Sequence, residues 1–556
     1  MTTKHRTQSA KPNSKAANFE KIQKFSKRNK YWPWIILALI ILFATAIRTR
    51  LLQIPLERDE GEFAYMGQLM LQGIPPYLMA YNMKLPGIYA AYALVMALFG
   101  QTIAGIHLGL ILVNSAAIFL LFMLTRRLFD NIAAIVAAAC YALLSLSPSV
   151  LGTSAHATQF IVPLALGGTI LLLRALDSGK ITILFVSGLL YGLAFIMKQH
   201  AIFLSAFALF YFTMHIINRR PIDWKRLVAG NIIFIIGMIL PFLITCAILY
   251  NAGVFSKFWF WTFTYASQYV SETTLSAAIQ NLKVMAPKAI APWFWTIAGV
   301  GITAIFWNEK AKFHRLFLLG FAIFSFLTIC PGFYFRKHYF ITLLPAVALL
   351  AGIAATALIQ WLSHRKIAPV IQIIPVFVLI AVLLSPVFQW GDFFFKITPV
   401  EACRLMYGLN PFPESIEIAQ YIKTHTSNDD RIAVIGSEPQ IYFYSNRKSA
   451  TGYIYAYGLM ETNDYASKMQ LDMIKEIETS RPKYVVLETI PTAWLQQKNS
   501  DMTIIKWSEK YFNQNYTAVG FIDSISEDNY KFYWDEESRR NKPLSPFYIY
   551  VLKRKL

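Results

Sequence analysis

Charged side chains are scarce in this sequence, and cysteines are scarcer. Asp, Glu, Lys and Arg make up 15% of the 556 residues, whereas they make up about a quarter of a soluble domain. The chain has 4 cysteines, far apart, of which Cys403 lies beyond the apolar stretches. The low charge excludes an ordinary soluble enzyme, and we expect neither a disulfide framework nor a cysteine metal cluster.

Acidic residues are also few, at 31 against 52 Lys and Arg, which gives a net charge of +21. In a chain that is 56% hydrophobic, basic residues in cytoplasmic loops and tails set the orientation in the membrane. The charge therefore does not indicate a nucleic-acid partner. Residues 1–30 are predicted to be a basic cytoplasmic tail before a first span that is retained.

Long apolar runs predict a polytopic α-helical membrane protein. Runs of roughly 18–23 residues match a hydrocarbon core about 30 Å thick, and hydropathy predicts about 11 or more spans. They lie within residues 31–390, at 31–49, 103–124, 131–150, 157–174, 181–197, 200–217, 228–250, 290–308, 315–330, 338–360 and 368–389.

The distribution of basic residues predicts the orientation. If the apolar stretch 86–100 lies at the interface without crossing, the basic clusters at 126–127, 174–180, 219–226, 310–315 and 364–366 all face the cytoplasm. The connections 50–102, 151–159, 251–289 and 331–338 then lie outside, as does the chain from residue 391. The N-terminus is cytoplasmic in this orientation.

Residues 391–556 differ in kind from the apolar part. Short β-rich runs at 431–436, 483–488, 516–522 and 548–552 alternate with helical patterns at 414–424 and 465–479. This alternation predicts an extracytoplasmic α/β domain. It contains no phosphate-binding glycine motif, and we expect it to bind the acceptor or to cap a cavity.

The first outside loop, 50–102, holds the densest charge of the membrane half. Asp59, Glu60 and Glu62 follow the first span, and Lys84 follows them on the same loop. Polar loops are common and explain such a cluster without any function. A carboxylate can also act as a general base on an acceptor hydroxyl, and a lysine can pair with a phosphate as a point charge.

The same loop resembles a known family. The runs RDEGEFAYMGQLMLQG (58–73), NMKLPGIYAAYALVMALFG (82–100) and TRRLFD (125–130) resemble the GT-C membrane glycosyltransferases, in the branch of bacterial protein O-mannosyltransferases and the lipid A aminoarabinose transferase. The resemblance implies a GT-C-like transmembrane domain over 31–390 in a bacterial inner membrane, with a periplasmic C-terminal domain. It also implies a polyprenyl-phosphate sugar donor, an extracytoplasmic acceptor, a catalytic Asp59 beside Glu60, and a Lys84 that contacts the carrier phosphate.

The second outside loop departs from the family pattern, which often has an acid there. This loop reads GTSAHATQ at 152–159. Either His156 serves a polar or proton-handling role, or Glu60 or Glu62 supplies the missing carboxylate. A hydrogen-bonded loop histidine with no role in chemistry is the plainer interpretation of His156.

Basic residues on the outer side are not explained by topology. Arg336, Lys337 and His338 precede the tenth expected span and resemble a family element that binds donor phosphate; anchoring to anionic lipid is the alternative. Lys198 is a second candidate, unless it only extends to the interface. The aromatic stretch 255–269 is predicted to be an interfacial belt rather than a sugar-stacking surface.

These patterns predict a glycosyltransferase that moves one sugar from a polyprenyl-phosphate donor to a lipid, glycan or protein acceptor. No cofactor is expected, and no metal-ligand spacing is present, although loops of Asp, Glu and His residues are able to host an ion. Two alternatives stay open: a transporter or flippase, disfavoured because charges gather at one membrane face, and a non-catalytic envelope assembly factor.

Overall fold

Apolar helices form the chain from Trp32 to Gln389. The computed structural model describes residues 31–271, 273–363, 369–526 and 529–555, so the basic tail 1–30 and the cluster 364–366 lie outside the described residues. Within them, six helical segments are long and apolar enough to cross a membrane: α2 (Trp32–Arg50), α5 (Ile103–Leu128), α7 (Ala157–Ser178), Gln199–Ile217 with α9 (Ile202–Ile217), α10 (Trp224–Asn251) and α17 (Leu344–Ser363).

Shorter or bent helices complete the bundle. The pair α13 (Leu275–Ala289) and α14 (Pro292–Trp307) is bent by 97° and counts as a seventh span if it crosses as one unit. The other apolar helices are α4 (Gly87–Phe99), α6 (Asn131–Leu146), α8 (Ile181–Met197), α16 (Arg315–Leu327) and α18 (Pro369–Gln389). Each expected span therefore coincides with an apolar helix, but the span number of about eleven is not confirmed, because several of these helices are shorter than a bilayer requires.

Small residues let two of the helices pack closely. A Cβ atom at Gly192 of α8 would lie 2.2 Å from the carbonyl oxygen of Met238, and one at Gly237 of α10 would lie 2.4 Å from that of Phe185. A side chain at either position would push the backbones of α8 and α10 apart. Close backbone packing at small residues is typical of helices in membranes, where the hydrophobic effect does not drive helices together.

A six-stranded sheet forms the core of the C-terminal region. Its strand order is β2-β1-β3-β6-β4-β5, with β1 parallel to β2 and β3 and the remaining pairs antiparallel. The strands are β1 (Arg431–Ile435), β2 (Lys448–Ser449), β3 (Tyr484–Glu488), β4 (Tyr516–Ser526), β5 (Asn529–Trp534) and β6 (Tyr548–Arg554). The predicted α/β character is confirmed. Two strands were not predicted: β2, which has two residues, and β5, although the aromatic residues of β5 favour a strand.

Helices flank this sheet, and short helices occur both in the C-terminal region and between the helices of the bundle. The longer ones are α21 (Phe412–His425), α23 (Ala466–Ser480) and α25 (Thr503–Asn515). The short ones are η1 (Pro148–Val150), η2 (Gln199–Ala201), α11 (Phe255–Trp259), η3 (Phe260–Tyr265, a π-helix), α12 (Ala266–Ser271), α15 (Glu309–Phe313), η4 (Pro331–Phe333), η5 (Lys337–Thr342), α19 (Gly391–Phe395), α20 (Pro399–Tyr407), α22 (Gln440–Ser445), η6 (Tyr457–Leu459), α24 (Pro491–Trp494) and α26 (Asp535–Arg540).

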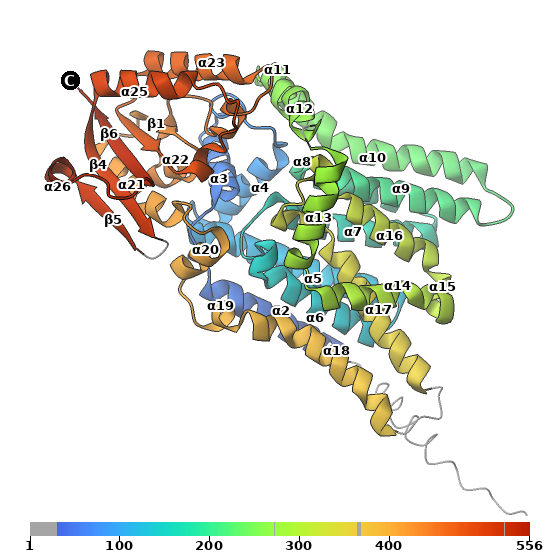
Figure 1. Ribbon diagram of the computed structural model, residues 1–556. Helices are drawn as coiled ribbons and strands as arrows, with labels where there is room; N and C mark the ends of the chain where they lie inside the picture. Colours follow the sequence, from blue (N-terminus) through green and yellow to red (C-terminus); the bar gives the residue numbers. More distant parts are fainter. Residues whose placement is uncertain (1–30, 272, 364–368, 527–528, 556) are drawn as a thin grey trace, which may run out of the picture.

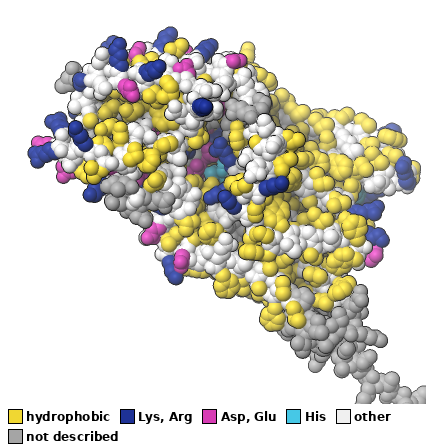
Figure 2. All heavy atoms as spheres, viewed as in Figure 1, with side chains coloured by type: hydrophobic (Ala, Val, Ile, Leu, Met, Phe, Trp, Pro, Cys, Tyr) yellow, Lys and Arg dark blue, Asp and Glu magenta, His cyan; other side chains and the backbone are white. Residues whose placement is uncertain are grey.

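Two helices of the first loop lie between the sheet and the bundle. These are α3 (Arg58–Leu71) and α4 (Gly87–Phe99), which pack against each other, and α3 also packs against α22 (Figure 1). The space-filling view shows a hollow beside them in which Lys, Arg, Asp, Glu and His side chains gather, while much of the bundle surface is hydrophobic (Figure 2). The fold thus places polar groups at one end of the apolar helices.

Candidate active site

The N-terminus of α3 arranges the acidic residues of the first loop. Glu57 caps the helix: its side chain accepts a hydrogen bond from the backbone N–H of Glu60 at 3.0 Å, and the Glu60 carboxylate accepts one from the backbone N–H of Glu57 at 3.5 Å. This capping box starts a helix in which residues three apart share a face. Asp59 and Glu62 therefore point to one side, and Glu60 points to another.

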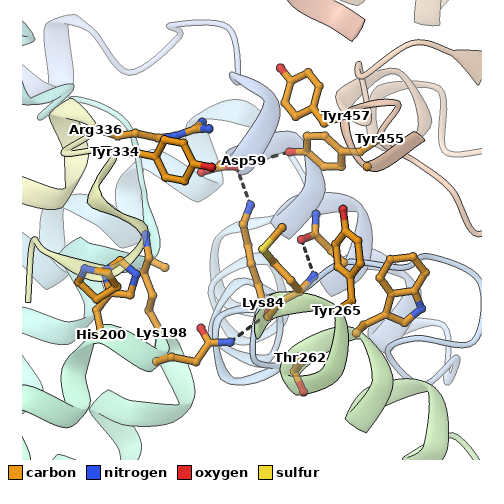
Figure 3. Close-up of a pocket in the computed structure, with 18 of the residues that line it drawn as sticks. Asp59, Lys84, Lys198, His200, Thr262, Tyr265, Tyr334, Arg336, Tyr455 and Tyr457 are labelled. Carbon is orange, nitrogen blue, oxygen red and sulfur yellow. Dashed lines mark hydrogen bonds and ion pairs between the residues drawn. The ribbon is translucent and has the colours of Figure 1, made fainter. Parts of the chain in front are cut away.

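Lys84 bridges the two acids that share this face. Its Nζ lies 2.5 Å from Asp59 Oδ1 and 2.8 Å from Glu62 Oε2, and Figure 3 shows Lys84 reaching toward Asp59. Burial alone would raise the pKa of Asp59, but the positive charge of Lys84 outweighs it and holds that pKa well below its usual range. Burial alone would lower the pKa of Lys84, and the two carboxylates raise it instead. The pair is ionised at neutral pH.

Glu62 holds Lys84 from the protein side. It is fully buried and accepts hydrogen bonds from the Tyr89 hydroxyl at 2.6 Å and the Asn82 amide at 2.9 Å. Because Glu62 is enclosed, its carboxylate positions the lysine and is not placed to contact a substrate.

Glu60 also faces away from the cavity. Its carboxylate accepts a hydrogen bond from the backbone N–H of Ala155 at 2.6 Å and lies 3.1 Å from Nε2 of His107 on α5. The structure therefore places Glu60 as a tie between the first loop, α5 and the loop that carries His156. Of the two acids predicted as the catalytic pair, Asp59 alone borders the cavity.

His156 comes from the second outer loop, as the residue before α7. It is 2% exposed, and neither ring nitrogen has a hydrogen-bond partner among the described residues. Its Nδ1 is 3.5 Å from Glu57 Oε1 and 3.8 Å from Asp59 Oδ2, and its ring stacks on that of His338 at 4.2 Å. Burial lowers the pKa of His156 to about 4, so it is neutral at physiological pH.

Two further cations reach the same cavity. The Lys198 ammonium lies 4.1 Å from the centroid of the Tyr339 ring, and the Arg336 guanidinium lies 5.6 Å from that of Tyr334. Burial lowers the pKa of Lys198 to about 7. Of the predicted basic cluster Arg336, Lys337 and His338, the first and the last line the cavity and Lys337 does not.

These residues border one cavity of about 710 Å³. It is lined by Asp59, Lys84, His156, Lys198, Arg336 and His338 of the predicted residues, and Figure 3 shows the first two opposite Lys198 and His200. Aromatic and apolar side chains make up much of the remaining wall. Loops that were all predicted to lie on one side of the membrane thus meet at a single site.

Aromatic residues that sequence reasoning did not select also line the cavity. Tyr455 donates a hydrogen bond to Asp59 Oδ1 at 3.5 Å, and Tyr457 lies beside it (Figure 3). Trp261 and Tyr265 come from the aromatic stretch predicted to be an interfacial belt. The run GYIYAYG at 452–458 is rich in tyrosine, which is a signal for a binding surface. Its sequence does not indicate that it contacts the first loop.

The C-terminal region holds the helix that carries Asp59. Arg58 is buried and donates hydrogen bonds to the Ser437 carbonyl at 2.9 Å and the Asn410 side chain at 2.6 Å, and it forms an ion pair with Glu438. Asn410, Ser437 and Glu438 of the C-terminal region therefore anchor α3. The C-terminal region supplies both this anchor and one wall of the cavity.

Comparisons with known proteins agree with this architecture. Residues 84–250 match the family described as dolichyl-phosphate-mannose-protein mannosyltransferase. A search among curated protein sequences finds no match.

Solved structures share the fold at low sequence identity. ArnT from Cupriavidus metallidurans, bound to undecaprenyl phosphate, is 15% identical with a TM-score of 0.55, over 83% of this chain and 94% of that chain. The oligosaccharyltransferase AglB from Archaeoglobus fulgidus, in complex with an inhibitory peptide and a dolichol-phosphate, is 12% identical with a TM-score of 0.54, over 93% of this chain and 75% of that chain. Together with the family match, these structures confirm the predicted resemblance to the GT-C membrane glycosyltransferases and the predicted class of enzyme.

Proposed function

We propose that this chain transfers a monosaccharide from a polyprenyl-phosphate donor to an extracytoplasmic lipid, glycan or protein. The observation that carries the proposal is the cavity itself, where a partly buried Asp59–Lys84 ion pair faces Lys198 and Arg336 across a largely aromatic and apolar wall. An anionic head group on an apolar chain needs this combination of cations beside apolar surface. The undecaprenyl phosphate of the ArnT structure and the dolichol-phosphate of the AglB structure support this choice of donor.

Lys84, Lys198 and Arg336 would hold the phosphate and stabilise the charge that grows on it as the sugar leaves. Lys84 is engaged by Asp59 and Glu62 in the free protein. A bound phosphate would compete with Asp59 for this lysine, and the pKa of Asp59 would then rise toward its ordinary value. Donor binding would in this way turn Asp59 into a better base for the acceptor hydroxyl.

The domain organisation follows the same proposal. Residues 31–390 would form the transmembrane transferase domain, with loop 50–102 as its catalytic loop. Residues 391–556 would form a periplasmic domain that closes the cavity, in a bacterial inner-membrane protein with a cytoplasmic N-terminus. Tyr455 and Tyr457 of that domain would contact the acceptor or the sugar, because they border Asp59.

Sugar transfer in membranes tests the proposal. Membranes that contain the full-length protein are supplied with a panel of radiolabelled polyprenyl-phosphate sugars, and wild type is compared with Asp59→Asn and Lys84→Ala. We expect label to move to an endogenous acceptor in wild type, with at least about a hundredfold loss in each variant, the scale of one base or one charge-stabilising donor.

Lys337→Ala is the matched control, because Lys337 is basic and close in sequence to Arg336 but is not among the residues lining the cavity. It should keep wild-type transfer. If no donor in the panel is consumed, or if folded Asp59→Asn matches wild type, the transporter and assembly-factor alternatives take precedence.

A further inference from the structure

Two buried acidic side chains lie where the parallel strands of the C-terminal sheet end. Glu488 is the last residue of β3, and Glu438 follows β1, the parallel neighbour of β3. A Cβ atom at Gly436 would lie 2.5 Å from Oε2 of Glu488, so a glycine leaves room for this carboxyl. In open α/β sheets, ligands commonly bind outside the carboxyl ends of the parallel strands. Here a side chain of the same protein, Arg58 of α3, takes that place and forms its ion pair with Glu438.

Glu488 forms no ion pair among the described residues. It is 2% exposed, and in the described part of the chain neither of its oxygens has a hydrogen-bond partner of normal geometry, although the backbone N–H of Ser437 lies beside it. Glu438 is fully buried and uses both of its oxygens, one on Arg58 and the other on the side-chain amide of Gln440. A buried carboxylate without a partner is so costly that the group normally keeps its proton instead. Glu488 is therefore the acid of this pair that the fold favours in its neutral form.

The surrounding charged and titratable groups do not supply the missing positive charge. Arg404 of α20 forms its ion pair with Glu414 of α21, which faces Glu438. Tyr442 of α22 and Tyr457 of η6 are neutral, because burial raises the pKa of Tyr442 to about 12 and that of Tyr457 above its usual range. Over the residues that the structure describes, two guanidinium groups thus face three carboxyls. One negative charge would be in excess if every acid were ionised.

We propose that Glu438 and Glu488 share one proton at neutral pH, and that this proton holds Arg58, and with it the start of α3, against the C-terminal region. With Glu488 neutral, the guanidinium faces a single carboxylate. With both acids ionised, the two carboxylates would repel each other and compete for one cation. Burial and the charge of Glu438 raise the pKa of Glu488 well above its usual range. Because the folded protein binds this proton more tightly than the unfolded chain does, the stability it contributes is complete in acid and is lost as the pH rises through the raised pKa.

The position of Arg58 links this proton to the cavity. Arg58 directly precedes Asp59, and both lie in the first turn of α3. A weaker hold on Arg58 would therefore loosen the turn that presents Asp59 to the cavity. Glu438 and Glu488 act in this way as positioning residues, since neither is among the residues that line the cavity. Their effect on sugar transfer rests on the proposed function, whereas the shared proton does not.

Infrared spectroscopy tests the shared proton without any need for activity. Full-length protein is purified in detergent, and the C=O stretching band of a protonated carboxylic acid, which a carboxylate lacks, is followed in difference spectra of wild type minus variant. At neutral pH we expect Glu488→Gln to remove one such band. Glu438→Gln should remove the same band, because Glu488 would then ionise as the partner of Arg58. The wild-type band should fade reversibly as the pH rises, a measurement that requires no variant.

Asp523→Asn is the matched control. Asp523 is as deeply buried, but its carboxyl accepts hydrogen bonds from the backbone N–H groups of Leu544 at 2.8 Å and Ser545 at 3.0 Å. This variant should keep the band. Thermal unfolding between pH 5 and 9 measures the consequence for stability. As the pH rises, the unfolding equilibrium should shift in favour of folded Glu488→Gln over wild type, by up to about tenfold per pH unit for one proton.

The proposal is overturned if either glutamine variant keeps the band, if Asp523→Asn removes it as well, or if wild type and Glu488→Gln respond to pH alike. A missing band together with sugar transfer that proceeds would reject the shared proton and leave the proposed function intact. A band without transfer would do the reverse.

Discussion

Raising the pH from 6 to 8 is expected to weaken donor binding about tenfold through a single side chain. Burial lowers the pKa of Lys198 to about 7, so about nine-tenths of the side chain is cationic at pH 6 and about one-tenth at pH 8. A polyprenyl-phosphate sugar is a phosphodiester with one negative charge throughout this range. Its binding should therefore follow the cationic fraction of Lys198, a tenfold change or about 1.4 kcal/mol.

The assay is the KM for a donor turned over in the transfer reaction, measured between pH 6 and 8.5 for wild type, Lys198→Arg and Lys198→Met. Arginine stays protonated at all these values, so its KM should be nearly independent of pH. The methionine variant should have a uniformly high KM.

The comparison isolates Lys198 from its neighbours. The pKa of His156 is about 4, and that of Lys84 is raised by its carboxylate partners, so neither changes charge in this range. Burial raises the pKa of Glu57 and of Glu62, but both acids are common to all three proteins and their effects cancel. A wild-type KM that does not change with pH, or one that changes as much in Lys198→Arg, would refute the reasoning.

Two further predictions concern how the C-terminal region holds α3. Gly61→Ala places a Cβ 2.7 Å from the backbone nitrogen of Gln440 and should lower the free energy of unfolding by about 1–3 kcal/mol. Thermal unfolding measures this loss. Gly299→Ala is the control and should be neutral, because its Cβ would meet nothing within 4 Å. Arg58→Met leaves Glu438 buried without its ion-pair partner and should cost about 3–5 kcal/mol, part of which Arg58→Met combined with Glu438→Gln should restore. Equal unfolding temperatures for the single and double variants would contradict this account.

The composition of the chain predicts much of its fold. Apolar runs mark most helices of the bundle, because burial in lipid requires them, although they do not mark α13. Short β-rich runs mark four strands of the sheet. Helix length is harder to predict: α6 and α16, for example, end sooner than the apolar runs suggest, whereas α8 has the predicted bounds. Span number cannot be counted from hydropathy when helices are short or bent.

The site could be predicted within the first loop and less well outside it. Asp59, Glu62 and Lys84 lie together, as their positions on one loop suggested. The Glu57–Glu60 capping box marks the start of a helix, and helical spacing from that start places Glu60 on a different face from Asp59 and Glu62. Tyr455 contacts Asp59 from a distant part of the chain. Such a contact depends on how the C-terminal region docks, and no local pattern encodes it.

The ion pair of Arg58 with Glu438 has a consequence for the order in which the protein is synthesised and folds. Arg58 and its ion-pair partner Glu438 are separated by 380 positions, and synthesis proceeds at roughly 5–20 residues per second. The loop with Asp59 is therefore made roughly 20–80 seconds before the partner that fixes it. Throughout that interval the first loop has been made but Glu438 has not, so α3 lacks this ion pair until the C-terminal region has been synthesised.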